Sequence, residues 1–300
     1  MKYTFTVFTP TFNRAASIHR VYESLQSQTF RDFEWLIVDD GSEDNTAELI
    51  EGWIEDAAFP IVYIRQKHSG KHVAWNRAVQ EAGGRFFVIA DSDDAFVPNA
   101  LERFLEVWRS IPKEDMEKYR GVACRCITDK GMMVGSVKIP SPWLDANEAD
   151  AKYFHKLQYE LWGMSRTELL KRYPSPNIAG LRFYPESIIW DKIGEKYLTR
   201  YFNEPLRIIY SDQANATTVR KVNNRYKENY YLWLHVLNDL KKYVFCEPLM
   251  FMKATIGIMR DGILSGRSYG QIVRDVNSFP YKVLVVMGSP FAWMLTKQTK

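Results

Sequence analysis

Apolar residues in the first 110 positions follow two different periodicities. Short runs rich in β-branched and aromatic residues predict four strands, at 3–9, 33–38, 61–65 and 86–90. Between and after them, apolar positions spaced three and four residues apart predict helices at 15–28, 46–56, 70–82 and 98–110. Strands that alternate with helices, and that are apolar on both faces, predict an α/β fold with a mostly parallel central sheet and helices on both faces.

The pattern after residue 115 is less regular. Residues 119–127 and 132–137 are expected to pair as two strands, and 155–173 to form a strand followed by a short helix. Residues 184–197 are expected as a loop and then a helix. A further strand is expected at 206–210, and helices at 227–241 and 268–286.

Polar segments follow three of the predicted strands. They are Thr9–Arg14, Asp39–Ser42 and Asp91–Asp94. Ligands bind beyond the carboxyl ends of the strands in open parallel sheets, so these segments are expected to converge on one crevice. Asp91-Ser92-Asp93 offers carboxylate oxygens, which suit Mg²⁺ or Mn²⁺ together with phosphate oxygens. A cation there would relieve the repulsion among the carboxylates.

Composition excludes several classes of protein. A hydrophobic fraction of 46% is typical of a globular chain rather than a disordered one. The three cysteines form no disulfide framework, and no apolar run is long enough to span a bilayer, so a cytoplasmic protein is expected. Residues 1–150 carry a formal charge of −7 and residues 151–300 carry +11. No nucleic-acid-binding motif accompanies this basic excess, so nucleic acid is not expected as a partner.

Three stretches resemble family 2 glycosyltransferases, which have the nucleotide-sugar-binding fold called GT-A. They are TPTFNRAASIHRVYESLQSQTFRDFEWLIVDDGSEDNT, KHSGKHVAWNRAV and FVIADSDDAFVPNAL, and they cover roughly the first 105 residues. The resemblance implies transfer of a sugar from a nucleotide diphosphate donor, with Mn²⁺ or Mg²⁺ bridging the diphosphate. Because no clean linker interrupts the chain, we expect one catalytic domain with a nucleotide-sugar-binding half at 1–115 and an acceptor-binding half at 116–220, followed by a helical extension at 221–300.

The resemblance assigns roles in donor binding. Pro10, Thr11 and Arg14 would border the nucleotide, and Asp40 with Asp39 would read the nucleobase, usually uracil. Lys71 would lie near the base or the diphosphate, although a solvated lysine at a helix start is the alternative. In the Asp91-Ser92-Asp93 element, Asp91 would bond the ribose and Asp93 would bind the metal.

An inverting transfer needs a general base that deprotonates the acceptor hydroxyl. The family places this base in an acidic pair at a helix start, and Asp191 matches the aspartate of that pair, with Trp190 where glutamate is common. Glu186 is the competing candidate. Trp190, Trp162 and Gly163 would line the acceptor site, and Ser211–Gln213 follow a predicted strand end near which family members contact the diphosphate.

The resemblance implies a UDP-sugar donor, with a GDP- or dTDP-sugar as the alternative, and a glycan or lipid-linked acceptor in surface polysaccharide synthesis. The alternatives are a nucleotidyltransferase that makes the sugar nucleotide, or a non-catalytic nucleotide-sugar-binding module. Aromatic and basic residues mix in 227–300, so this region could lie on the inner face of the membrane, pack onto the domain, or make oligomer contacts.

Overall fold

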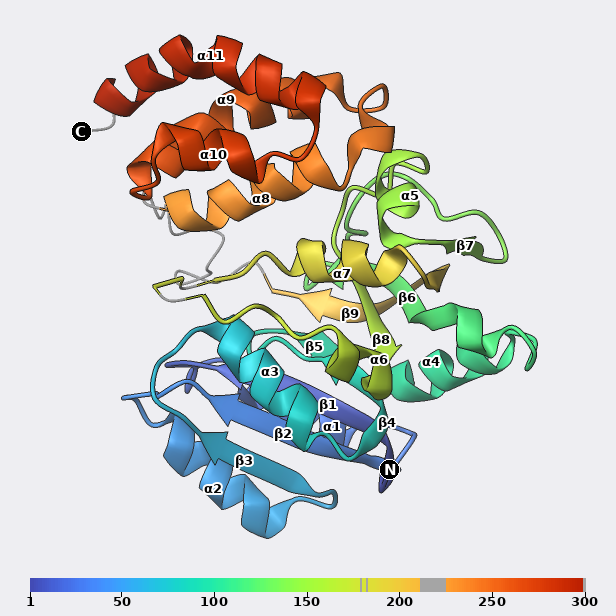
Figure 1. Ribbon diagram of the computed structural model, residues 1–300. Helices are drawn as coiled ribbons and strands as arrows, with labels where there is room; N and C mark the ends of the chain where they lie inside the picture. The colour runs from blue at the N-terminus through green and yellow to red at the C-terminus, as the bar shows by residue number, and fades with distance from the viewer. Residues whose placement is uncertain (179, 182, 211–224, 299–300) are drawn as a thin grey trace. The chain divides into compact units, whose positions relative to one another are not determined.

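The computed structural model describes residues 1–178, 180–181, 183–210 and 225–298. The chain folds as two compact units (Figure 1). The first comprises Met1–Asn177 and Ile189–Gln213, and the second comprises Ile178–Ile188 and Ala214–Lys300. Residues 211–213, near which family members often place a diphosphate-contacting or loop residue, lie outside the described residues.

One mixed sheet forms the centre of the first unit. Its strands are β1 (Tyr3–Thr11), β2 (Phe33–Asp39), β3 (Ile61–Arg65), β4 (Gly84–Ile89), β5 (Ala95–Phe96), β6 (Tyr119–Thr128), β7 (Leu144–Ala146), β8 (Leu161–Arg166) and β9 (Leu198–Ile209). Among the described residues the order is β3-β2-β1-β4-β8-β6-β9-β5, and β7 pairs with β9. The strands β3, β2, β1 and β4 are parallel, while β8 runs antiparallel to both β4 and β6. The predicted α/β class with helices on both faces is confirmed.

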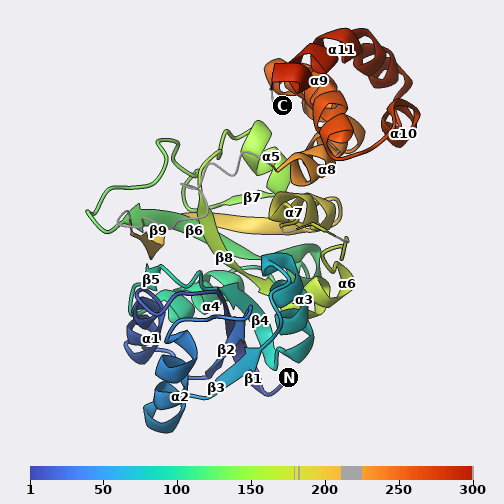
Figure 2. The same cartoon turned by 90° about the vertical axis from the view of Figure 1, so that its left-hand side faces the viewer.

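Helices cover both faces of the sheet (Figure 2). They are α1 (His19–Gln26), α2 (Thr46–Asp56), α3 (Lys71–Glu81), α4 (Ala100–Arg109), α5 (Glu148–Tyr153), α6 (Thr167–Arg172) and α7 (Glu186–Gly194), whose first three residues belong to the second unit. On one face α1, α2 and α4 pack against Phe5, Val7 and their neighbours in the main core. On the other face, Trp75 of α3 packs edge-on against Phe8 of β1. With both faces covered, the ends of the parallel strands are left for polar side chains.

The prediction for the second half of this unit was partly wrong. Residues 132–137 do not form a strand; a single bridge joins Met133 to Ile127. Instead β6 pairs with β8 and β9, whose residues are far away in the sequence. The strand predicted at 206–210 is the end of the longer strand β9. Short β7 carried too weak an alternation to be recognised.

The second unit contains helices α8 (Tyr226–Asn238), α9 (Pro248–Leu264), α10 (Tyr269–Asp275) and α11 (Phe279–Gln298). The single helix predicted at 268–286 is two helices, separated at 276–278. Helix α9, which was not predicted, packs against both α8 and α11. Among the described residues, no helix is long and apolar enough to cross a membrane.

Two glycines offer a matched test of the packing between β6 and β8. A Cβ added at Gly121 would lie 1.9 Å from the carbonyl oxygen of Met164, whereas one added at Gly52 of α2 meets nothing within 4 Å. We expect Gly121→Ala to lower the free energy of unfolding by about 1–3 kcal/mol. Gly52→Ala should raise it by about 0.5–1 kcal/mol, because alanine favours a helix interior. Urea denaturation measures both, and an unchanged midpoint for Gly121→Ala would contradict the close approach.

Candidate functional site

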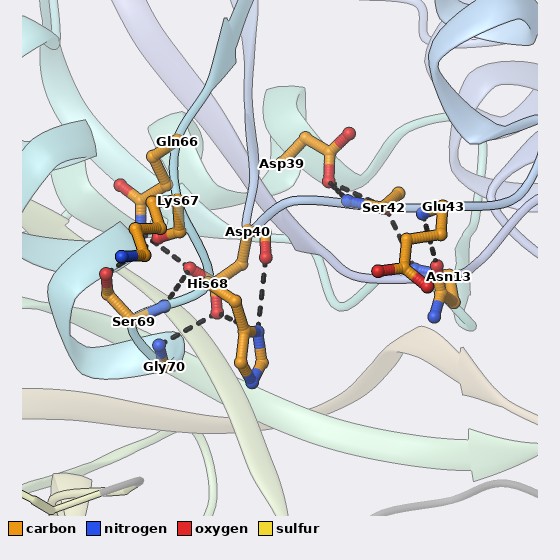
Figure 3. Close-up of polar contacts among 10 residues, drawn as sticks. All are labelled: Asn13, Asp39, Asp40, Ser42, Glu43, Gln66, Lys67, His68, Ser69 and Gly70. Carbon is orange, nitrogen blue, oxygen red and sulfur yellow. Dashed lines mark hydrogen bonds and ion pairs between the residues drawn. The ribbon is translucent and has the colours of Figure 1, made fainter.

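The carboxylate of Asp40 holds the segment that precedes α3 (Figure 3). Its Oδ1 accepts hydrogen bonds from Gln66 Nε2 and the Ser69 amide, both at 2.8 Å. Its Oδ2 accepts from the Gly70 amide at 2.8 Å and lies 3.0 Å from His68 Nδ1. The end of β2 is therefore tied to the loop between β3 and α3.

Asp39, the last residue of β2, is fully buried. Its Oδ1 accepts from the Ser42 amide at 2.8 Å and from the Ser42 hydroxyl at 2.6 Å (Figure 3). Its Oδ2 accepts from the Tyr63 hydroxyl at 2.6 Å, and burial together with this bond raises the pKa of Tyr63 well above its usual value. The carboxylate thus forms the turn after β2, and its predicted contact with the nucleobase stays a prediction.

The segment after β1 is joined to the turn after β2. Asn13 has a φ of 53°. Its backbone N–H donates to Ser42 Oγ at 2.9 Å, and its side-chain Oδ1 accepts from the Glu43 backbone N–H at 2.8 Å (Figure 3). The Arg14 amide donates to Thr46 Oγ1 at 3.0 Å. Thr11 Oγ1 is buried and has no hydrogen-bond partner among the described residues.

Two cations from distant parts of the chain neutralise Asp91. Lys71 Nζ, at the start of α3, donates to Oδ1 at 2.9 Å, and Arg207 Nη2, on β9, donates to Oδ2 at 2.9 Å. Burial alone would raise the pKa of Asp91, but Lys71 and Arg207 outweigh it and hold the pKa well below its usual range. Asp91 is therefore ionised, and its side chain stays 27% exposed.

Arg207 also binds Asp94, which is buried. Its Nε donates to Asp94 Oδ2 at 2.6 Å, and its Nη1 lies 3.1 Å from Glu160 Oε1. Burial raises the pKa of Asp94 to about 7 against the opposing effect of Arg207, and the charges of Asp91 and Asp93 add to the rise. One guanidinium therefore holds two carboxylates of the cluster in place.

Asp93 faces the segment after β1. Arg14 Nη2 lies 3.5 Å from its Oδ2, and both side chains are about one-fifth exposed. Arg20 Nη1 donates to the Asp93 carbonyl at 3.3 Å, and Ser17 Oγ donates to the Ser92 carbonyl at 3.0 Å. Asp93 is thus oriented by α1 and the residues before it, with its carboxylate reaching the surface.

These contacts bring the three predicted polar segments together. Ser69 and Gly70 bind Asp40 after β2, and the next residue, Lys71, binds Asp91 after β4. Arg14 after β1 completes the set through Asp93. The convergence expected from a parallel sheet is confirmed.

An aromatic pair beside Asp40 was missed in the sequence. The rings of Phe12 and His68 lie 4.4 Å apart at 32°, and Phe12 is 40% exposed. Phe12 stands within the quoted TPTFNR segment, between residues that were assigned to the nucleotide. An exposed aromatic residue at a strand end was the available signal.

Asp191 and Trp190 lie on the part of α7 that belongs to the first unit. Asp191 is 9% exposed. The Trp190 ring lies edge-on to the Trp75 ring, with centroids 5.3 Å apart. The Arg120 guanidinium lies 4.5 Å from the centroid of the Trp190 ring. Packing fixes this ring while leaving it partly exposed.

Trp162 and Gly163 serve the packing of the sheet. The Trp162 ring is 4% exposed, stacks on Phe96 with centroids 4.6 Å apart, and donates its Nε1 hydrogen to the Ile89 carbonyl at 2.6 Å. A Cβ at Gly163 would lie 2.2 Å from the Val122 carbonyl oxygen. Packing within the sheet accounts for the burial of Trp162 and for the glycine at position 163. The predicted contact of these residues with the acceptor stays a prediction.

The carboxylates at this site suit a divalent cation whose other ligands come from a bound substrate. No group of three or more His, Cys, Asp or Glu suited to a metal occurs among the residues the structure describes. Asp91 is held by Lys71 and Arg207, while Asp93 lies 3.5 Å from Arg14 with its side chain about one-fifth exposed. Mg²⁺ is commonly bound through one or two carboxylates together with substrate phosphates, so Asp93 fits this pattern.

Comparison with known proteins agrees with this geometry. Residues 6–116 match the family model for glycosyl transferase family 2, and they contain the tied loops after β1, β2 and β4. The chain carries a family 2 glycosyltransferase domain. The residues to which the resemblance assigns donor binding lie within this range.

Relatives of the domain share parts of the chain. YibD of Escherichia coli, described as an uncharacterized glycosyltransferase, is 26% identical over 70% of this chain and 59% of its own length. TuaG of Bacillus subtilis, a putative teichuronic acid biosynthesis glycosyltransferase, is 34% identical over 34% of this chain and 40% of its own. A GalNAc(5)-diNAcBac-PP-undecaprenol beta-1,3-glucosyltransferase of Campylobacter jejuni is 27% identical over 42% and 38%. The chain therefore spans less than two-thirds of these relatives.

Solved glycosyltransferases share the fold. S. aureus TarS 1–349 in complex with UDP-GlcNAc superposes with a TM-score of 0.65 at 16% identity, over 99% of this chain and 91% of that one. The mannosyltransferase PcManGT of Pyrobaculum calidifontis, in complex with GDP-Man and Mn²⁺, gives 0.53 at 16% identity, over 100% and 84%. The GT-A fold predicted from the resemblance is confirmed.

Removing Arg207 tests the neutralisation of the carboxylates. We expect Arg207→Ala to lower the free energy of unfolding by about 3–5 kcal/mol, because Asp91 and Asp94 lose a buried partner. Arg103→Ala is the matched control: this arginine pairs with Glu204 and Glu106 at the surface, where ion pairs contribute about 0–1 kcal/mol. Adding Asp94→Asn to Arg207→Ala should recover part of the loss. Equal losses in the two single variants, measured by urea denaturation, would contradict the central role of Arg207.

Proposed function

We propose that this protein is an inverting, metal-dependent glycosyltransferase that uses a UDP-sugar donor. The observation that carries the proposal is the joining of the loops after β1, β2 and β4 through Asp40, Lys71, Asp91 and Arg14. This arrangement places carboxylates suited to a nucleobase, a ribose and a metal ion beside cations suited to a diphosphate. The family 2 match over residues 6–116 supports the same reading.

Asp93 would hold Mn²⁺ or Mg²⁺ together with the diphosphate of the donor. Such a cation, when bound, neutralises the charge that develops on the departing diphosphate. Arg14 and Lys71 lie beside the carboxylates and would bind phosphate oxygens of the donor. The presence of Mn²⁺ in the PcManGT complex supports a divalent metal in this fold.

Asp40 would read the nucleobase by exchanging one of its present partners. Its two oxygens already have four partners, which is about the capacity of a carboxylate. Of these, His68 is the one able to leave, because its side chain is 61% exposed. An incoming base N–H would take the place of His68 and lie against Phe12, whose ring His68 now covers.

Asp191 would act as the general base, and Trp190 would form part of the acceptor wall. Burial suits a base that must be shielded from water, and the indole of Trp190 offers a face on which a sugar ring can stack. A glycan or lipid-linked acceptor in surface polysaccharide synthesis is supported by the names of two relatives, one putatively in teichuronic acid biosynthesis and one acting on a PP-undecaprenol-linked glycan.

The two other functions have less support. A nucleotidyltransferase would favour a glycine-rich phosphate loop near its N-terminus, and Thr9–Arg14 contains no glycine. A non-catalytic binding module would have no need for a carboxylate at position 191.

Thermal unfolding with nucleotides tests donor and metal binding. We expect UDP with Mn²⁺ to raise the melting temperature more than UDP or Mn²⁺ alone, because Asp93 and the diphosphate would hold the ion together. Asp93→Asn should lose this extra rise. Asp56→Asn, at the exposed end of α2, is the matched control and should keep it. No rise with UDP, GDP or dTDP in the presence of Mn²⁺ would contradict the proposal.

Release of UDP from UDP-N-acetylglucosamine or a related donor tests the base. We expect Asp191→Asn to keep UDP binding and to lower turnover by about 10²–10⁴-fold, the usual contribution of general-base catalysis. Glu186→Gln, at the first residue of the same helix, should keep turnover near that of the parent. The reverse result for the two variants would assign the base to Glu186.

A further inference from the structure

Helix α11 of the second unit has two opposite apolar sides. Val285, Ala292 and Thr296 are buried, at 0%, 0% and 6% exposure. The ring of Tyr281 on α11 stacks on that of Phe251 on α9, with centroids 5.7 Å apart, so the buried side faces α9. The opposite side is exposed from Val283 to Met294, about three turns. We call it the α11 face: Val283, Leu284, Val286, Met287, Phe291 and Met294, which are 42–71% exposed.

This exposed side differs from that of an ordinary surface helix. Solvent-facing positions of such a helix are normally charged or polar, but residues 283–296 contain no charged residue. Three further apolar residues are exposed, Phe245 shortly before α9 and Leu249 and Met252 in its first turns, at 96%, 66% and 62%. An exposed apolar helix face of this kind indicates an interaction site.

The charges around the α11 face favour an anionic lipid surface as its partner. After Asp275 the sequence contains three lysines and neither aspartate nor glutamate. Lys282 precedes the exposed face directly, and the exposed Lys241, Lys242 and Lys253 accompany the apolar residues near the start of α9. Cationic side chains beside Phe, Leu and Met side chains are typical of a helix that lies in the headgroup region of a bilayer.

The helix would lie along the bilayer rather than cross it. None of the described helices has the length and hydropathy required for a span. One side of α11 is occupied by α9, so only the α11 face is open to lipid. Insertion to the depth of the headgroups would bury this face and leave the packing of the unit intact.

We propose that the α11 face, together with Phe245, Leu249 and Met252, docks the second unit on a membrane containing anionic lipid. This docking goes beyond sugar transfer and does not depend on it. It would hold the protein at the surface where a lipid-linked molecule is found.

Vesicle flotation of the full chain tests the docking. The probes are vesicles of phosphatidylcholine alone and vesicles of equal parts phosphatidylcholine and phosphatidylglycerol. We expect the protein to float mainly with the anionic vesicles, and less at high salt because salt screens the lysines. The triple variant Leu284→Ser, Met287→Ser, Phe291→Ser should partition at least about tenfold less.

The matched control removes three exposed apolar residues of the first unit: Leu49→Ser, Ile54→Ser, Val62→Ser, at 37%, 44% and 38% exposure. It should float like the parent, and both triple variants should still bind UDP. Absence of flotation, or equal loss in both triple variants, would overturn the proposal. So would sedimentation showing that the parent self-associates through the α11 face, with the serine variant monomeric and flotation unchanged.

Discussion

The site depends on the neutralisation of carboxylates gathered at the end of β4. Asp91, Asp93 and Asp94 lie within four residues, and two of them are held by Arg207 from β9. Lys71, at the start of α3, and Arg14, after β1, supply further positive charge. The protein therefore provides much of the counter-charge itself. In the proposed function, Asp93 would hold an ion that arrives with the donor. This arrangement explains how a strand can remain buried while ending in such a cluster.

The parallel topology supplies the partners of the cluster. Because β1, β2 and β4 run in the same direction, their final residues reach one edge of the sheet. Asp40 then fixes Ser69 and Gly70, and so places Lys71 at the first turn of α3 with its ammonium on Asp91. Asp40, which follows β2, thus determines the position of Lys71, the cation that pairs with Asp91 after β4. In the proposed function, this short segment would couple donor recognition to metal binding.

The sequence predicted the first half of the fold well because its signals are local. Helix 46–56 and strand 61–65 have the predicted bounds, since apolar periodicity and the flanking turns define them without reference to the rest of the chain. Arg207 could not be found in this way. Its role rests on the pairing of β9 with β5, which brings residue 207 beside residue 96, and no local pattern specifies that pairing. Trp162 was assigned to the acceptor site from the family resemblance, which gives a position in the chain but not the direction of the ring. In the structure this ring stacks on Phe96, and its contact with the acceptor stays a prediction.

The C-terminal helices show the same limit in another form. A helix that is apolar on every side reads from its sequence as a buried one, because periodicity distinguishes sides only when one of them is polar. In α11 both sides are apolar, yet Val285 and Ala292 are fully buried while Met287 is 71% exposed. Only packing against α9 reveals which side has a partner within the chain. Exposure of the α11 face to water costs free energy in proportion to its apolar area. Contact with lipid would remove that cost.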